Sequence, residues 1–304
     1  MIFSEEGAPL EVRGLVKRYG EFELGPIDFA LQSGRVTALV GTNGAGKSTL
    51  LKCVMGFVLP EEGEARVFGA RNQIDQIPWR WNVGYMGEER AFYQRWNAAK
   101  NLELIGSFHP NWDTERVRRI AQRLSLPLDK PVRELSKGNL AKLALTSALG
   151  HAPSLLLLDE PFSGLDPVVR DEVIDILWEW LGAWDTTLFY STHILGDVAR
   201  LADEIAFLCD GQLIRRATTE ELCGAWRRFT FDLDGEVPAL DAAIRGERQG
   251  VFHRSLSSNG ARTRSHLERL GARRIECTQL SVEEIAVEIL RAGSAATEAE
   301  VSVE

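Results

Sequence analysis

The alternation of apolar and polar positions divides the beginning of the chain into strands and a helix. Residues 10–33 alternate in this way around Gly20, which predicts two strands joined by a turn. Residues 36–40 form an apolar, β-rich segment that runs directly into a glycine-rich loop. Apolar side chains at i, i+1 and i+4 then predict a helix over residues 47–54. The pattern therefore predicts a strand, a glycine loop and a helix in direct succession.

A longer helical segment separates this beginning from the rest of the predicted core. Residues 97–150 have helical character, and Asn97 and Asp113 are residues of the kind that cap helix N-termini. We expect a helical insertion between two halves of an α/β core.

The second half of the predicted core contains strands without alternation. Residues 155–158 are consecutive leucines, which is typical of a strand buried on both faces of a parallel sheet. Residues 186–192 and 205–209 predict two more core strands. Asp210 and Gly211 follow, and this pair predicts a hairpin turn.

The periodic pattern weakens toward the end of the chain. Two short strands are predicted at 229–233 and 251–253, and a capped amphipathic helix is predicted over 280–290. We assign residues 223–292 to a small α/β extension. Residues 293–304 are rich in Ala, Ser and Glu, and this composition predicts disorder.

Composition and charge restrict the possible functions. The 304 residues allow about two domains, and the formal charge of −9 argues against a nucleic-acid-binding surface. The four cysteines lack C-x-x-C spacing, so they indicate neither a zinc ribbon nor a disulfide framework, as expected in a reducing cytoplasm. No apolar stretch approaches the roughly 18 residues that span a bilayer, and the acidic beginning is not a signal peptide. We expect a soluble chain whose membrane role depends on a partner.

The glycine loop carries a specific chemical motif. Residues 41–48 read Gly-Thr-Asn-Gly-Ala-Gly-Lys-Ser and fit G-x-x-x-x-G-K-[ST], the pattern of a phosphate-binding loop. Glycines let the backbone approach phosphates without Cβ clashes, and N–H groups at the following helix start attract anions. Lys47 is expected to reach the β- and γ-phosphates and Ser48 to bind Mg²⁺. The other candidate nucleotide-binding residues of this segment are Gly41, Asn43, Gly44, Ala45, Gly46 and Thr49.

An acidic pair follows the leucine strand. Asp159 at the strand end is expected to reach Mg²⁺ directly or through water, and Glu160 is expected to polarise an attacking water. An acidic pair can also simply end a strand, but the presence of Lys47 in the same chain favours the catalytic interpretation.

The order of these motifs resembles that of the ATP-binding subunit of an ABC transporter. After the phosphate loop come Leu135-Ser136-Lys137-Gly138-Asn139, then Asp159-Glu160, then Ser163-Gly164-Leu165-Asp166, and finally His193. The resemblance covers residues 10–222 of the chain.

The resemblance implies a fold and a division into domains. The fold is α/β, a P-loop NTPase core of the ABC type with an antiparallel β subdomain and a helical subdomain at about residues 90–150. Residues 1–222 then form the ATP-binding domain. Residues 223–292 form a small α/β C-terminal extension, and residues 293–304 form its tail.

In this family the signature loop closes over ATP held by a second subunit. Ser136 and Gly138 match the family pattern, whereas Lys137 and Asn139 replace its usual Gly and Gln. The serine hydroxyl and the loop N–H groups still suit a γ-phosphate, although Ser-Lys-Gly is also compatible with an ordinary helix start. The position of the loop, 23 residues before Asp159 when counted from Ser136, favours the signature.

Four further residues receive roles from the resemblance. Tyr19 matches the aromatic that stacks on adenine, although it also suits a partly buried strand. Glu88 occupies the place of the Q-loop glutamine, where a carboxylate can still bind Mg²⁺ or water, or it belongs to a solvated acidic turn. Asp166 matches the D-loop that links the two sites of a dimer. His193 matches the switch histidine that contacts the γ-phosphate, which makes Lys47, Glu160 and His193 the expected catalytic residues.

The resemblance also implies partners. ATP and Mg²⁺ are the expected cofactors, and a second ATP-binding subunit, identical or paralogous, would complete a head-to-tail sandwich around two ATP molecules. Closure of this dimer would drive a separate multi-span membrane permease, which places the chain at the cytoplasmic face of the cell membrane. The segment 107–113 and the Lys-Gly signature resemble a bacterial exporter-type subgroup. A tryptophan cluster at positions 79, 81, 96 and 112 belongs either to the core or to a docking groove for the permease.

Two alternatives remain at the level of the sequence. One is a soluble ABC ATPase that acts on nucleic acid or the ribosome. Such relatives usually carry a second cassette, long coiled coils or zinc modules, which the sequence lacks, and we expect no nucleic-acid partner. The other alternative is a non-catalytic regulatory cassette, which only the altered signature favours.

Overall fold

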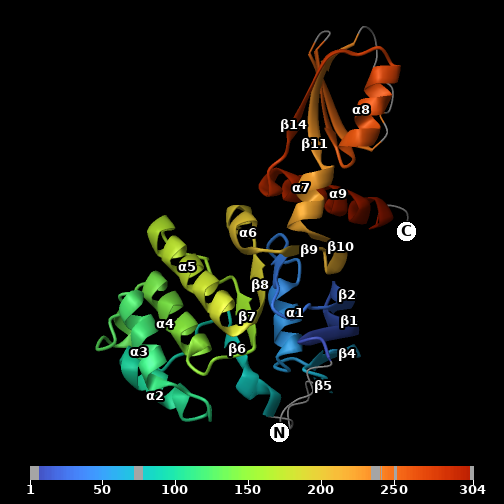
Figure 1. The fold of residues 1–304 in the computed structure, drawn as a ribbon. Coiled ribbons are helices and arrows are strands. Elements are labelled where there is room, and N and C mark those ends of the chain that lie inside the picture. Colours follow the sequence, from blue (N-terminus) through green and yellow to red (C-terminus); the bar gives the residue numbers. More distant parts are fainter. Residues whose placement is uncertain (1–6, 72–77, 234–239, 241, 250–251, 302–304) are drawn as a thin grey trace.

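The molecule contains three sheets, two of which pack together in one body with most of the helices (Figure 1). The computed structural model describes residues 7–71, 78–233, 240, 242–249 and 252–301. The first two sheets and most helices form one body, and the third sheet lies at the far end.

A six-stranded sheet lies at the centre, in the order β10-β9-β3-β8-β7-β6. Neighbouring strands are parallel, except that β9 and β10 form the predicted hairpin. Every residue of β3, β7 and β8 is buried, which explains their continuous apolar sequence. The carboxyl ends of β3, β7 and β8 meet at one edge, where ligands bind in sheets of this type. The strands are β3 (Val36–Val40), β6 (Val83–Met86), β7 (Leu155–Asp159), β8 (Thr187–Thr192), β9 (Glu204–Cys209) and β10 (Gln212–Thr218).

A second, antiparallel sheet packs on one face of the central sheet in the order β2-β1-β4-β5. Helix α1 (Lys47–Val54) lies between the two sheets, and Leu155 and Leu157 contribute to this core. Leu156 and Leu158 point to the core on the opposite face, as the two-residue period of a strand requires. The strands are β1 (Leu10–Tyr19), β2 (Phe22–Ala30), β4 (Glu62–Val67) and β5 (Ala70–Arg71).

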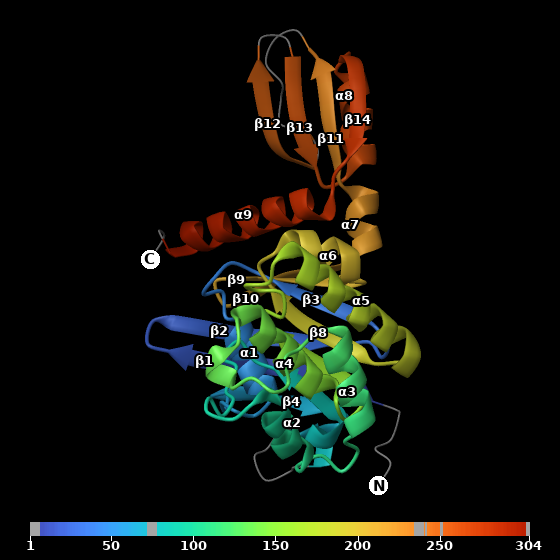
Figure 2. The same ribbon diagram turned by 90° about the vertical axis from the view of Figure 1, so that its left-hand side faces the viewer.

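The predicted helical insertion is present as three helices, and a further group of helices covers the face of the central sheet that is turned toward the viewer in Figure 2. Asn97 accepts a hydrogen bond from the N–H of Lys100 and Asp113 from that of Arg116, so both cap helices as predicted. In the described part of the chain, no helix combines the length and the apolar character needed to cross a membrane. The helices are α2 (Ala98–Gly106), α3 (Thr114–Arg123), α4 (Lys137–Leu149), α5 (Pro167–Trp184), α6 (Leu195–Leu201) and α7 (Thr219–Ala225), with 3₁₀ turns at Pro78–Asn82 and Val132–Glu134.

A third sheet, antiparallel and in the order β12-β13-β11-β14, forms the C-terminal unit. The predicted strands at 229–233 and 251–253 overlap β11 and β13, although Val251 lies outside the described residues. The strand β14 was missed because almost all of its side chains are exposed, which leaves no alternation. The elements are β11 (Arg227–Asp232), β12 (Ala243–Gln249), β13 (Phe252–Ser257), β14 (Arg273–Gln279) and helix α8 (Gly260–Arg269).

The last helix, α9 (Val282–Val301), corrects the prediction for the end of the chain. Residues 293–301 are helical, so the prediction of disorder from 293 onward is wrong there, and 302–304 lie outside the described residues. A small residue allows this helix to approach the core closely, because a Cβ on Gly293 would lie 2.6 Å from Ile214 Cδ1. Ala, Ser and Glu favour a helix when it has a surface to pack on.

Helix α9 also returns from the extension to the central body (Figure 2). Ile285, Ala286 and Ile289 belong to the same hydrophobic core as Val198 and Leu201 of α6. The boundary at residue 223 therefore separates the third sheet from the core, but the helix after that sheet packs as part of the core.

We expect the substitution Ile285→Ala to lower the free energy of unfolding by about 2–4 kcal/mol, because Ile285 is fully buried in the central core. Urea unfolding followed by tryptophan fluorescence would measure this loss. Glu283→Ala, at an exposed position of the same helix, is the control and should change stability by less than about 0.5 kcal/mol. Equal effects of the two substitutions would contradict the packing of α9 on the core.

Candidate functional site

The glycine loop connects β3 to α1 at the carboxyl edge of the central sheet. Gly44 and Gly46 have φ values of 84° and 104°, a region that favours glycine. A Cβ on Gly46 would lie 2.9 Å from Leu24 Cδ1 and 3.0 Å from Phe22 Cζ. The carbonyl of Ala45 accepts a hydrogen bond from the N–H of Gly211 at 3.1 Å, so the β9–β10 turn helps to fix the loop. The loop conformation therefore requires glycine both for its dihedral angles and for its packing.

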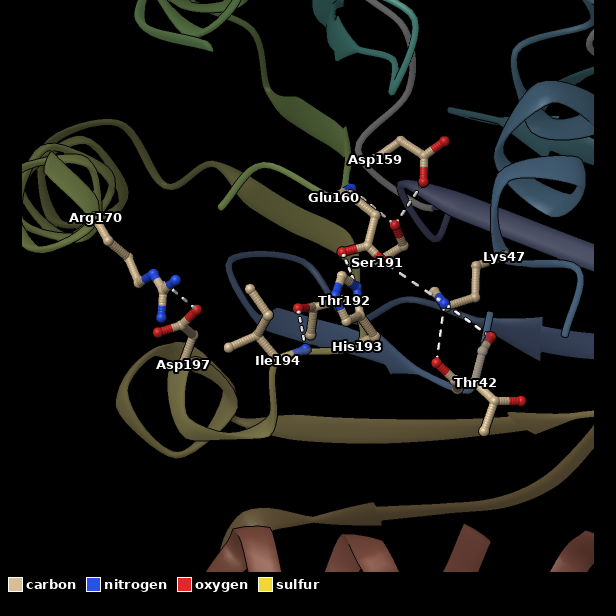
Figure 3. A network of polar contacts seen from close by, with 11 residues as sticks. Thr42, Lys47, Asp159, Glu160, Arg170, Ser191, Thr192, His193, Ile194 and Asp197 are labelled. Carbon is tan, nitrogen blue, oxygen red and sulfur yellow. Dashed lines mark hydrogen bonds and ion pairs between the residues drawn. The ribbon is translucent and has the colours of Figure 1, made fainter. Parts of the chain in front are cut away.

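Lys47, the first residue of α1, is almost completely buried beneath this loop. Its Nζ donates hydrogen bonds to the carbonyl oxygens of Gly41, at 2.9 Å, and Thr42, at 3.1 Å. The same ammonium lies 3.4 Å from Glu160 Oε1 (Figure 3). A buried cation with these partners is held in a fixed position at the loop.

A single hydroxyl organises the acidic pair after β7. Ser191 Oγ donates a hydrogen bond to Asp159 Oδ1 at 2.6 Å and accepts one from the N–H of Glu160 at 2.9 Å (Figure 3). Glu160 has a φ of 48°, the left-handed region that non-glycine residues rarely adopt. The bond from its N–H helps to hold this strained residue in place.

His193, directly after β8, faces the carboxylate of Glu160. His193 Nδ1 lies 2.8 Å from Glu160 Oε2. Because an ionised carboxylate only accepts hydrogen bonds, this contact places a proton on Nδ1. Thr192 Oγ1 accepts a hydrogen bond from the N–H of Ile194 at 2.9 Å and fixes the turn that follows the histidine.

Lys47, Glu160 and His193 line one pocket with a volume of about 560 Å³. The structure brings Glu88, Glu160 and His193 to this pocket from three separate segments of the chain. Ser163 and Phe22 also line it, and the sequence interpretation missed both. The phosphate-loop residues that line the pocket are Asn43, Gly44, Gly46, Lys47, Ser48 and Thr49.

The aromatic side chain of this pocket differs from the predicted one. Tyr19 is not among the residues that line it; its ring is about half exposed, with Lys17 Nζ 5.1 Å from the ring centre. Phe22, which pairs with Tyr19 across the β1–β2 turn, lies at the pocket instead. The sequence could have indicated Phe22, because it lies in the same predicted hairpin as Tyr19. Which of these two aromatic side chains faces the phosphate loop depends on how the hairpin packs against the rest of the chain.

Ser136 and Gly138 of the signature and Asp166 of the D-loop segment lie outside this pocket, although Ser163 of the same segment lines it. Ser136 caps α4, since its Oγ accepts a hydrogen bond from the N–H of Asn139 at 3.1 Å. Asp166 caps α5 in the same manner. A Cβ on Gly138 would lie 3.8 Å from Leu165 Cδ2, which shows how closely the two loops approach. One chain alone therefore does not bring Ser136, Gly138 and Asp166 to the nucleotide pocket.

The residues present fit a nucleotide with a divalent cation. Ser48 lines the pocket. Asp159 is not among the lining residues; it lies buried directly before Glu160, and its Oδ2 lacks a hydrogen-bond partner among the described atoms. Within the described residues, no group of three or more His, Cys, Asp or Glu side chains forms a complete cage for a metal. Mg²⁺ commonly takes few protein oxygens and completes its coordination with phosphates and water. This donor set suits such a shared site.

Comparison with known proteins identifies the family. The model of the ABC transporter family matches residues 24–163. The chain is 34% identical over 240 residues to an uncharacterized ABC transporter ATP-binding protein of Synechocystis, covering 76% of this chain and 67% of the relative. It is 30% identical to the bacitracin transport ATP-binding protein of Enterococcus faecalis, covering 76% of each. The chain belongs to the ATP-binding proteins of the ABC transporter family.

Solved structures agree with this assignment. The structure of an ATP-binding subunit of an ABC transporter superposes with a TM-score of 0.65 at 27% identity, covering 70% of this chain and 91% of that one. The dimeric structure of a post-hydrolysis state of the ATP-binding cassette MJ0796, bound to ADP and Pi, shares the fold, with a TM-score of 0.63 at 21% identity, covering 69% of this chain and 98% of that one. The predicted fold, an α/β P-loop core of the ABC type, is confirmed. The third sheet lies beyond the segment that the family model matches.

We expect Gly46→Ala to weaken ATP binding by about tenfold or more, because it strains a left-handed residue and pushes a methyl group against Leu24 and Phe22. Titration with a fluorescent ATP analogue would measure the affinity. Gly182→Ala, at an exposed helical position with no atom within 4 Å of the new Cβ, is the control. It should leave the affinity unchanged, and an equal loss in both variants would contradict the proposed role of Gly46.

Proposed function

We propose that this chain is the ATP-hydrolysing subunit that powers a separate membrane permease, with ATP and Mg²⁺ bound at the pocket of Lys47, Ser48 and Glu160. One observation carries the coupling part of this proposal. Glu88 lines both the nucleotide pocket and a second groove, which lies between the end of β6 and the helical subdomain. A single side chain that touches both spaces can link the state of the nucleotide to whatever occupies the groove.

The hydrolytic chemistry follows from the positions of the side chains. Lys47 and the N–H groups of the glycine loop would bind the phosphates and stabilise the charge that develops on them. Ser48 and Asp159 would hold Mg²⁺, which supplies further positive charge at the phosphates when it is bound. Glu160 would orient a water molecule and accept its proton, and His193 would hold the Glu160 carboxylate in place and contact the γ-phosphate.

The second groove suits a helix of the permease. It has a volume of about 550 Å³, and apolar side chains such as Met55, Phe57 and Phe92 contribute to its lining. Burial, with a smaller effect of the neighbouring His109, lowers the pKa of His151 to about 4, so this residue of the groove is uncharged at neutral pH. Large apolar side chains are exposed near the groove, which is typical of a surface that docks a partner. They are Phe57, Leu59, Trp81, Tyr93 and Phe108.

The tryptophans at positions 79, 81, 96 and 112 were predicted to belong either to the core or to a docking groove, and we assign Trp79, Trp81 and Trp112 individually. Trp79 is buried in the core, whereas Trp81 is more than a third exposed. Trp112 packs against Gly106 and Gly150 and fills space between helices. Trp81 is therefore the member of the cluster that we assign to docking.

The second subunit of the proposed machine is another ATP-binding cassette. Ser136, Gly138 and Asp166 lie outside the pocket of their own chain, and they would contact ATP only across a head-to-tail dimer. The bacitracin and daunorubicin proteins among the relatives are named for drug transport or resistance, which supports export as the direction. The dimer would work at the cytoplasmic face of the membrane, bound to the permease.

We expect Glu160→Gln to lower the rate of ATP hydrolysis by about 100-fold or more, because an amide does not accept the proton of water. ATP affinity should change little, since Lys47 and the glycine loop remain, and an ATP-bound dimer should accumulate. A phosphate-release assay and gel filtration with ATP and Mg²⁺ would measure the two effects. Glu89→Gln, next to the groove and outside the nucleotide pocket, is the control. An unchanged hydrolysis rate in Glu160→Gln would rule out Glu160 as the base.

We expect Phe57→Glu to abolish co-purification of the permease while basal ATP hydrolysis is retained, because it places a charge on the apolar groove. Tagged Glu160→Gln, with and without Phe57→Glu, would be purified from membranes of its native host in mild detergent with ATP and Mg²⁺, and the partners identified by mass spectrometry. Basal ATP hydrolysis would be measured on Phe57→Glu alone. Phe252→Glu, at a similarly exposed aromatic of the third sheet, is the matched control. Recovery of ribosomes or DNA-repair proteins, in place of a multi-span membrane protein, would refute the transport proposal.

A further inference from the structure

An ion pair with a buried carboxylate joins the two helices that follow the D-loop and the switch histidine. Helix α5 begins immediately after Asp166, and α6 begins two residues after His193. Arg170 lies near the start of α5 and Asp197 near the start of α6, with 3.6 Å between Arg170 Nε and Asp197 Oδ2 (Figure 3).

The carboxylate of this pair is buried, the arginine is partly exposed, and the two groups are not within hydrogen-bond distance. Asp197 is only 4% exposed, and burial raises the pKa of its carboxyl group, while Arg170 and Arg200 oppose this rise. The separation of 3.6 Å exceeds the length of a hydrogen bond. Asp197 Oδ2, Arg170 Nε and the neighbouring Tyr190 hydroxyl are buried without hydrogen-bond partners among the described atoms. Because unsatisfied buried polar groups cost free energy, a small movement of α5 toward α6 that closed this gap would be favourable.

Each end of the pair reaches a loop of the nucleotide site. The other arm of Arg170 donates a hydrogen bond from Nη2 to the D-loop carbonyl of Leu165 at 3.5 Å, and the Arg170 N–H donates one to the carbonyl of Asp166 at 3.0 Å. At the opposite end, the N–H of Asp197 contacts the carbonyl of Ile194, the residue after His193, at 3.4 Å. A continuous chain of contacts therefore runs from Glu160 through His193 and the ion pair to the D-loop.

We infer that Arg170 and Asp197 are positioning residues that transmit the nucleotide contact of His193 to the D-loop of the same subunit. This inference rests on the proposed function, because the D-loop acts on the second nucleotide site only in the ATP-bound dimer. Neither residue lines the nucleotide pocket, so the pair acts on turnover and on communication between sites, not on the binding of ATP. A ligand contact at one site would then bias the loop that faces the other site.

The chain contains a matched control for this pair. Arg200 and Asp171 form an ion pair between the same two helices, but their side chains are 47% and 59% exposed. Exposed pairs of this kind contribute little to stability. The Arg200 and Asp171 variants control for the loss of a charge between these helices, whereas the separate effects on kcat and KM and the exchanged pair distinguish transmission from a loss of stability.

The experiment measures Mg²⁺-dependent ATP hydrolysis by the purified full chain as a function of ATP concentration. For Arg170→Met and Asp197→Asn, we expect kcat to fall about tenfold and the Hill coefficient to approach 1, with KM for ATP changed less than about twofold. The double variant should be no worse than either single one, because both break one contact. The exchange Arg170→Asp with Asp197→Arg should recover part of kcat and of the cooperativity. Arg200→Met and Asp171→Asn should behave as the wild type.

The outcomes separate this inference from the proposed function. An active and cooperative wild type, with unchanged kcat and Hill coefficient in Arg170→Met and Asp197→Asn, would overturn the inference and leave the proposed function intact. Equal losses in the Arg200 and Asp171 variants would also overturn it. If circular dichroism shows that the single variants do not fold, the exchanged pair decides: a folded exchange variant without recovered cooperativity overturns the inference. A wild type without ATP hydrolysis would refute the proposed function first.

Discussion

The nucleotide site depends on the hydroxyl of Ser191, which joins the ends of two neighbouring parallel strands. It donates to Asp159 Oδ1 and accepts from the N–H of Glu160, and it thereby fixes a carboxylate and a left-handed backbone residue at the same time. Strain of this kind persists only where the surroundings enforce it. With Glu160 fixed, its side chain can contact both Lys47 and His193, so three segments of the chain meet at one carboxylate.

A second feature of the site is that the nucleotide pocket and the apolar groove share a lining residue. Glu88 follows β6, the strand that pairs with β7, and it lines both the nucleotide pocket and the apolar groove. Glu88 and Glu160 thus bring two carboxyl groups to the lining of one pocket.

The C-terminal part of the chain divides between two structures. The third sheet and α8 form a small unit with its own core of Phe229, Phe231, Leu233 and Leu267. Helix α9 leaves this unit and packs on α6, the helix that follows His193, and on β9. A displacement of the third sheet that moved α9 would therefore disturb contacts near His193 and near the β9–β10 turn, whose Gly211 N–H donates a hydrogen bond to the phosphate loop.

The sequence by itself determined the family, the central strands β3, β7, β8 and β9, the helix caps at Asn97 and Asp113 and the identity of the phosphate-loop and acidic residues. These features depend on local patterns, since a buried parallel strand is continuously apolar and a phosphate loop needs glycines at fixed spacing. Only the tertiary structure decided that Phe22 and not Tyr19 lines the pocket, that Ser191 holds the acidic pair, and that α9 packs on the central core through Ile285, Ala286 and Ile289. Each of these depends on which distant surface a residue meets, and long-range packing leaves no periodic signal in the sequence around it.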